Sequence, residues 1–176
     1  MSSFKKILLL GLGVILCMMF LNSCDTKEEK DKRHARETFR SIESCINEKN
    51  LIGFKDLFNS LGSSELVEAD IEDLFSLFSS GITLNERPYD DYLTVTDWVD
   101  NGSYGKTICW AREITNNETG EKFILSVLEC TDDGSEDDVG IIRLILYSVD
   151  DEDDFDRWWT ELEDNERPNG IIQYKK

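Results

Sequence analysis

The sequence contains a single histidine, His34, and this scarcity excludes several kinds of chemistry. His34 lies beside Arg33 and Ala35 in a charged segment near the N-terminus, so a Ser-His-Asp or Cys-His arrangement lacks a well-placed base. Structural zinc sites take Cys and His in closely spaced pairs, and this chain has no such pairs. We therefore expect neither triad catalysis nor a zinc centre, and no cofactor is indicated.

Long apolar runs are also scarce, and the one near the N-terminus has the features of an export signal. Two lysines in MSSFKK precede fifteen uncharged residues, ILLLGLGVILCMMFL. A membrane span needs about 20 apolar residues, so a cleaved signal peptide is favoured. The next residues, Leu21-Asn22-Ser23-Cys24, resemble the bacterial lipobox. This resemblance implies a signal peptide over 1–23, a lipid on Cys24 and an extracytoplasmic position on the outer face of the cytoplasmic membrane. An ordinary cleaved signal with an incidental cysteine is the alternative.

The five cysteines do not suggest a disulfide framework. Cys17 lies in the signal peptide and Cys24 is the expected lipid site, which leaves an odd number, Cys45, Cys109 and Cys130. The hairpin predicted below places Cys130 three positions from the partner of Cys109 and on the other face of the sheet. We therefore expect three buried free thiols, with a single Cys109–Cys130 bridge as the alternative.

Basic residues are few, because 19 Lys and Arg stand against 37 Asp and Glu, a net charge of −18. Residues 1–23 contain two lysines and no acid, so the mature chain carries −20. Such a field repels nucleic acid and anionic lipid headgroups, which excludes phosphate-reading functions. The remaining length suits one domain. We predict a lipidated cysteine with a charged tether over 24–33 and a single globular domain over 34–176.

The first half of the domain shows helical periodicity. Apolar residues recur at spacings of three and four, which predicts three amphipathic helices, over 30–49, 50–61 and 68–81. Gly62 is expected to stop the second helix, Asp70 to cap the third and Gly81 to close it.

After Gly81 the period changes to about two, which indicates strands. We predict four strands, over 92–99, 104–115, 121–130 and 139–149, with a hairpin turn at NNETG. In that hairpin Thr115 should face Glu121, and Cys109 should face Val127. The last strand is apolar on both faces, so it should be central and covered on both sides. The order of elements predicts an α+β domain in which a strongly bent antiparallel sheet of about four strands wraps three helices.

Over residues 20–172 this pattern resembles a known family. It is carried by RETFRSIESCINEKNLIGFKDLFNS, IEDLFSLFSSGI, YGKTICWAREITN and VGIIRLILYSVD. The family comprises small uncharacterised lipoproteins of Gram-positive bacteria with a nuclear-transport-factor-2-like, cystatin-type cone fold. The resemblance implies a conical pocket, which some relatives use for small-molecule binding or for isomerase or dehydratase chemistry. It also implies that the sheet face could form a homodimer, and it carries over no catalytic residues.

The C-terminal stretch adds a short predicted helix. Phe155, Trp158, Trp159 and Leu162 recur at helical spacing, and this helix should pack on the domain as a lid or flank. Aromatics at such spacing are usually core residues. If exposed, Trp158 and Trp159 are the candidate interaction residues.

One acidic stretch follows the spacing of an EF-hand loop. Carboxylates occupy positions 1, 3, 5, 7 and 12 of twelve residues, namely Asp150, Glu152, Asp154, Asp156 and Glu161. The sixth position, normally Gly, is Phe155, and a helix is predicted to begin inside the loop. A solvated loop is therefore favoured over a Ca²⁺ site.

Two functions follow from these observations. The favoured one is a non-enzymatic, membrane-anchored lipoprotein that binds a small apolar ligand or a basic envelope protein. The alternative is a dehydratase or isomerase that uses a buried carboxylate and a tyrosine. The candidate bases are Asp97, Glu113 and Glu129, and the candidate donors are Tyr92, Tyr104 and Tyr147. No spacing shows that these side chains converge, so ordinary sheet residues are the favoured interpretation.

Overall fold

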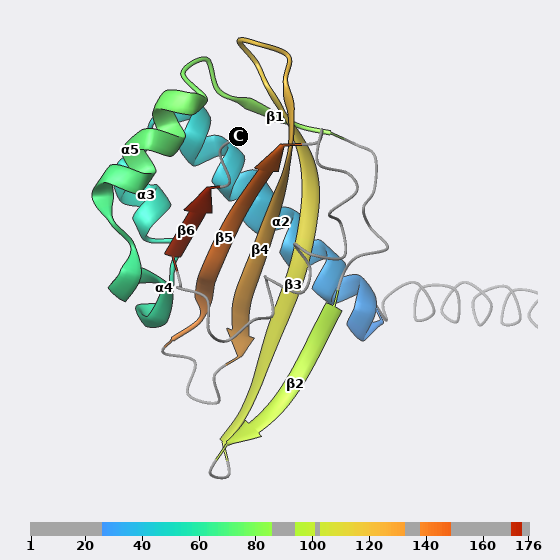
Figure 1. Ribbon diagram of the computed structural model, residues 1–176. Coiled ribbons are helices and arrows are strands. Elements are labelled where there is room, and N and C mark those ends of the chain that lie inside the picture. Colours follow the sequence, from blue (N-terminus) through green and yellow to red (C-terminus); the bar gives the residue numbers. More distant parts are fainter. Residues whose placement is uncertain (1–25, 86–93, 101–102, 133–137, 149–169, 174–176) are drawn as a thin grey trace, which may run out of the picture. The chain divides into compact units, whose positions relative to one another are not determined.

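A computed structural model of the 176-residue chain describes residues 26–85, 94–100, 103–132, 138–148 and 170–173 (Figure 1). The chain divides into two compact units, Met1–His34 and Ala35–Lys176. The described helices are α2 (Lys27–Glu48), α3 (Leu51–Lys55), α4 (Ser60–Glu65) and α5 (Glu68–Leu77). The described strands are β1 (Ile82–Leu84), β2 (Thr94–Asp100), β3 (Ser103–Asn116), β4 (Lys122–Asp132), β5 (Gly140–Ser148) and β6 (Gly170–Gln173).

Helix α2 confirms the first predicted helix, although it begins three residues earlier, at Lys27. In the first unit, Lys32 Nζ lies 2.8 Å from the carboxylate of Glu28, an i,i+4 pair that supports the first turns. The predicted apolar stripe is buried, and it comprises Ala35, Phe39, Ile42, Cys45 and Ile46. The helix ends before Lys49, whose φ of 54° is left-handed. Within the described ranges, no helix combines the length and hydropathy that a membrane crossing requires.

The second predicted helix is wrong as a single element, because two short helices, α3 and α4, replace it. The Asn50 side chain accepts a hydrogen bond from the Gly53 N–H at 2.9 Å, and Asn59 accepts one from Gly62 at 2.9 Å. Each asparagine thus satisfies a free N–H at a helix start. Asn59 therefore begins a new helix, and Gly62 lies inside it instead of stopping the previous one.

Helix α5 confirms the third predicted helix but not its cap. The N-cap residue is Val67, which makes no side-chain cap, and Asp70 lies in the first turn. At the other end, the Lys49 ammonium donates to the carbonyl oxygens of Phe75, at 2.9 Å, and Phe78. These carbonyls lack partners within the helix, and a cation at a helix C-terminus also meets the favourable end of its dipole.

The strands form one mixed sheet in the order β1-β3-β4-β5-β6, and β2 also pairs with β3 (Figure 1). Strand β1 pairs with the C-terminal end of β3 and β2 with its N-terminal half. Strand β6 runs parallel to β5. The prediction of about four strands is therefore too low by two, because β1 and β6 were not predicted, and the sheet is mixed instead of wholly antiparallel. Strands β1 and β6 have only three and four residues, too few to produce a periodic signal.

The β3–β4 hairpin is confirmed, with a register one residue away from the prediction. Thr115 faces Lys122, and Cys109 faces Leu128. Cys130 faces Thr107, two positions along β3 from Cys109, so both cysteines lie on the same face. The expected separation onto opposite faces is therefore wrong. The described cysteines, including these two, are nevertheless buried, and none forms a disulfide within the described part of the chain.

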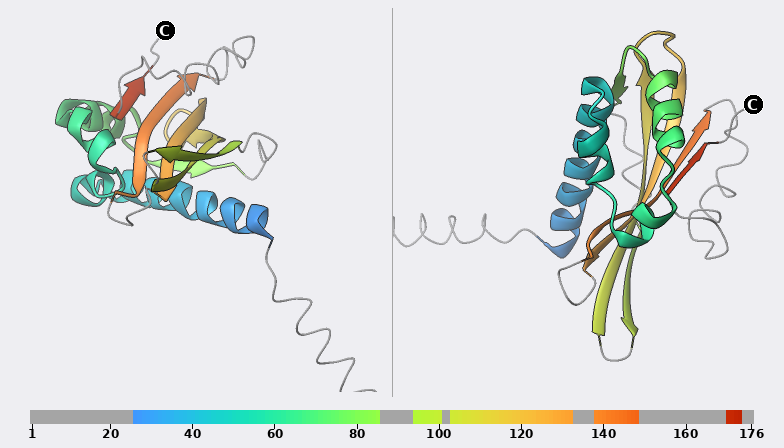
Figure 2. Two further views of the ribbon diagram at one scale, coloured as in Figure 1. Left: turned by 90° about the horizontal axis from the view of Figure 1, so that it is seen from below. Right: turned by 90° about the vertical axis from the view of Figure 1, so that its left-hand side faces the viewer.

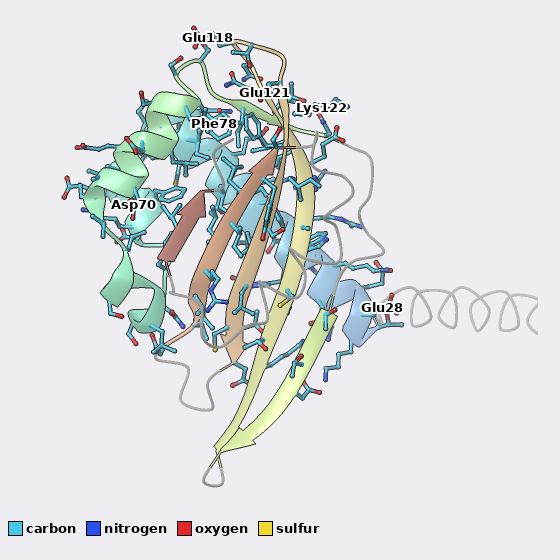
Figure 3. All side chains as sticks on the ribbon, in the orientation of Figure 1. Glu28, Asp70, Phe78, Glu118, Glu121 and Lys122 are labelled. Atoms are coloured by element: carbon cyan, nitrogen blue, oxygen red, sulfur yellow. The ribbon has the colours of Figure 1, made fainter. Side chains whose placement is uncertain are left out.

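Helices cover one face of the sheet in the second unit. From Ala35 onwards, helix α2 runs along that face, with α3 to α5 beside it towards β6 (Figures 1 and 2). Two edge-to-face aromatic pairs join the layers, Phe39 with Trp110 and Phe78 with Phe123, each at 5.3 Å between ring centroids. Figure 3 shows Phe78 in the layer between α5 and the strands. Strand β5 lies between β4 and β6 and is buried on both faces, which confirms its predicted central position.

Candidate functional site

A buried carboxylate lies between α2 and the sheet. Glu129 is 8% exposed, and the Thr38 hydroxyl lies 3.1 and 3.0 Å from its two oxygens. One hydroxyl has one proton, so Thr38 donates to one carboxylate oxygen at a time. The position follows from strand alternation, because Glu129 continues the series Phe123, Leu125 and Val127 on the helix-covered face.

A small cavity opens beside this carboxylate. The α2 side of its wall includes Ala35 and Phe39, and the sheet side includes Ile108 and Trp110. The space inside it that a water-sized molecule can occupy is about 10 Å³, room for about one water molecule. Pockets for small molecules usually enclose about 300–1,000 Å³. The space beside Glu129 is therefore smaller than a substrate site, and the contact with Thr38 attaches α2 to β4.

The other candidate bases lie elsewhere. Glu113 contacts the Lys122 ammonium at 2.8 Å and accepts a hydrogen bond from the Asn85 amide. Asp97 is exposed on β2, in register with Lys106 on β3. Glu113 is thus part of a polar network at the β1 end of the sheet, and Asp97 lies at the solvent surface.

The sheet register separates Glu113 from Glu129. Glu129 faces Ile108, five positions along β3 from Glu113, which at about 3.4 Å per residue is roughly 17 Å. An odd number of positions also places the two carboxylates on opposite faces. The structure therefore does not bring the candidate bases together as a catalytic pair.

The candidate tyrosines and several other predicted sites fall partly or wholly outside the described residues. Tyr147 is 8% exposed on the face opposite Glu129, and the backbone of Tyr104 pairs with Val99. Other predicted sites lie outside the described residues. They are Cys24, Tyr92, Trp158, Trp159 and the acidic stretch of Asp150, Glu152, Asp154, Asp156 and Glu161. Among the described residues, no group of three or more His, Cys, Asp or Glu side chains could hold a metal ion.

Two buried polar residues that were not predicted from the sequence lie on the second face of the sheet. Arg143 on β5 is 3% exposed, and Ser126 on β4 is fully buried. The Ser126 hydroxyl makes no hydrogen bond within the part of the chain that the structure describes. Arg143 interrupts the apolar strand IIRLIL, and that interruption was the available signal.

The thiol of Cys45 is a poor nucleophile in this environment. Burial raises its pKa, and the carboxylates of Glu48 and Asp56 add to the effect. The thiolate is the reactive form of cysteine, so a raised pKa makes this side chain inert near neutral pH. Cys45 therefore has a packing role on the apolar face of α2.

Comparison of the chain with family models, with curated proteins and with solved structures found no match.

Proposed function

We propose that this chain is a lipoprotein anchored through Cys24 at the outer face of the cytoplasmic membrane, with an acidic domain that acts as a non-enzymatic interaction module. The anchoring part is supported by the charged start, the fifteen-residue apolar run and the lipobox-like Leu21-Asn22-Ser23-Cys24. Lipoproteins of this kind carry two or three acyl chains, which hold a protein on a bilayer far more firmly than one.

The observation that carries the non-enzymatic part is the filling of the space between helices and sheet. Six aromatic side chains are buried there, Phe39, Phe54, Phe58, Phe78, Trp110 and Phe123. Truncating such a residue costs about 3–5 kcal/mol, so a ligand that displaced one would have to offset that loss. A dehydratase or isomerase would need a substrate-sized cavity beside Glu129, and the space there is smaller. Recognition at the surface is therefore favoured over binding in the interior.

We also propose that the sheet bends around the helices as in the cone of cystatin-type folds. Strand β3 has 14 residues and curves along its length (Figure 1). It pairs with β2 over one part and with β1 over another, on the same edge. A strongly bent sheet that wraps the helices, as in cystatin-type folds, accounts for this change of neighbour.

Anchoring is tested by feeding cells a labelled fatty acid and following its incorporation into the protein. The wild type should become labelled, Cys24→Ser should not, and Cys17→Ser should be labelled like the wild type because Cys17 leaves with the signal peptide. An unlabelled wild type, or equal labelling of Cys24→Ser, would show that Cys24 is not the lipid site.

The filled interior is tested by mass spectrometry of the purified protein after denaturing extraction. We expect no small apolar molecule at an amount equal to the protein, other than the lipid attached to Cys24. Recovery of one such ligand per chain would contradict the packing argument and restore a pocket-based function.

A further inference from the structure

Exposed apolar side chains gather on the helical layer of the second unit. Large hydrophobic residues that remain exposed in the described part of the chain are Ile52, Leu61, Val67, Leu77 and Val139, and four of these five belong to residues 50–80. Ile52 is 73% exposed and Val67 55%. Single exposed hydrophobic residues are ordinary on protein surfaces, so the meaning of this set depends on its arrangement.

An ion pair brings two of these residues to the same place. Ile52 lies one helical turn before Lys55 on α3, so both side chains share a face. Lys55 Nζ lies 3.1 Å from the Glu68 carboxylate at the start of α5, and Val67 directly precedes Glu68. Ile52 is thus one turn from Lys55, and Val67 is the chain neighbour of Glu68, so each exposed apolar residue lies next to one member of the ion pair. We call these four residues the α3–α5 surface. Leu61 lies on α4, the helix between α3 and α5 in the chain.

The chain segment that carries this surface is strongly acidic, while the Lys49 ammonium lies at the C-terminal end of α5. Residues 50–80 contain one lysine and six acids, a net charge of −5, and the acids are Asp56, Glu65, Glu68, Asp70, Glu72 and Asp73. The lysine already contacts Glu68. Figure 3 shows Asp70 on α5, among side chains that end in oxygen atoms along the outer side of this helix. The α3–α5 surface, which has one charge of each sign, thus lies within a segment that carries an excess of negative charge.

We infer that the α3–α5 surface binds a cationic amphipathic segment of an envelope protein, an inference that rests on the proposed interaction function. Apolar side chains of the partner pack on Ile52 and Val67, and its lysines or arginines face the carboxylates of α5. Apolar anchors surrounded by polar groups are the usual anatomy of a protein interface. The complementary charge speeds association and disfavours acidic partners.

The experiment uses a fluorescent synthetic peptide of about 18 residues, roughly five helical turns, with leucine and lysine at amphipathic spacing. A matched peptide replaces every leucine with serine and keeps the charge. Binding to the full-length protein is measured by anisotropy at about 0.15 M salt, where charges beyond about 8 Å are screened. We expect the leucine peptide to bind at least about tenfold more tightly than the serine peptide, because only its leucines can pack on Ile52 and Val67. A tenfold difference in Kd corresponds to about 1.4 kcal/mol of binding free energy.

The variant Ile52→Ser/Val67→Ser should reduce affinity for the leucine peptide about tenfold, to near that of the serine peptide. Val139→Ser removes an exposed apolar residue outside residues 50–80 and should leave the affinity unchanged. All three side chains are exposed, so the fold should persist, and circular dichroism checks this. Equal binding of both peptides, or unchanged affinity of the double variant, would overturn the inference that the α3–α5 surface binds such a segment. Fatty-acid labelling of the same variants reports on Cys24 separately, so failure of the surface is distinguishable from failure of the anchor.

Discussion

The packing of α4 against β5 makes a sharp prediction at Gly62. A methyl group added there would lie 2.9 Å from the Phe58 ring and 3.0 Å from the Ile142 carbonyl oxygen, and the Ile141 carbonyl oxygen is closer still. Favourable carbon contacts are about 3.5–4.0 Å. The variant Gly62→Ala therefore forces α4 and β5 apart.

The strand has little freedom to retreat. The Ile141 N–H donates to the Leu57 carbonyl at 2.8 Å, and its own carbonyl accepts from the Asn59 N–H at 3.1 Å. Overpacking of this kind costs about 1–3 kcal/mol. Weakening the hydrogen bond from the Asn59 N–H to the Ile141 carbonyl in the variant would cost about 1 kcal/mol more. Alanine recovers about 1 kcal/mol of helix propensity relative to glycine. We expect Gly62→Ala to lower the free energy of unfolding by about 1–3 kcal/mol, which is about 2–4 °C in melting temperature for each kcal/mol.

Gly53→Ala is the matched control, because Gly53 occupies the same position after an asparagine cap in α3. The added methyl there would meet the Asn50 side chain, with Nδ2 at 2.5 Å. That side chain can rotate away, so a lost cap of about 1 kcal/mol is offset by about 1 kcal/mol of helix propensity. Urea denaturation of both variants measures the difference. Equal losses in both, or no loss in Gly62→Ala, would refute the close approach of α4 and β5.

Two further predictions concern buried polar groups. Thr38→Val keeps the side-chain shape but removes the donor to the Glu129 carboxylate, so the free energy of unfolding should fall by about 1.5–3 kcal/mol. An unchanged urea midpoint would contradict that contact. The Cys45 thiol stays protonated in the folded protein above the pH at which it ionises in the unfolded chain. Stability should therefore decrease as pH rises from the ordinary cysteine pKa, about 8.5, towards the raised value. In a pH series of urea midpoints, stability of the Cys45→Ala variant should fall less steeply with rising pH than that of the wild type. Identical slopes for the two proteins would contradict a raised pKa for Cys45.

Elements with long periodic patterns were predictable and short ones were not. The apolar face of α2 and the β3–β4 hairpin follow from local spacing, because burial of one face requires that spacing. The break between α3 and α4 was missed, since the apolar spacing continues across Asn59 and only its cap begins a new helix. Strands β1 and β6 were missed because their pairing depends on distant residues.

The candidate site shows the same limit. Sequence alone proposed Glu129, Glu113 and Asp97 together, because each carboxylate lies in or beside a predicted strand. Only the register placed Glu129 on the helix-covered face and Glu113 on the other, about five positions away along β3. The partner of Glu129, Thr38, is 91 residues distant in the chain, and no local pattern connects the two.

The sequence by itself determined the α+β class, the apolar faces of the helices, the central strand β5 and the strongly acidic charge of the chain. These are local or additive properties, since periodicity reports which face is buried and net charge is a sum over residues. The tertiary structure decided the strand order, the one-residue register of the hairpin, the packing of the described aromatic side chains between helices and sheet, and the approach of Gly62 to β5. Those features depend on which distant segments meet, and close packing leaves room for only one arrangement of them.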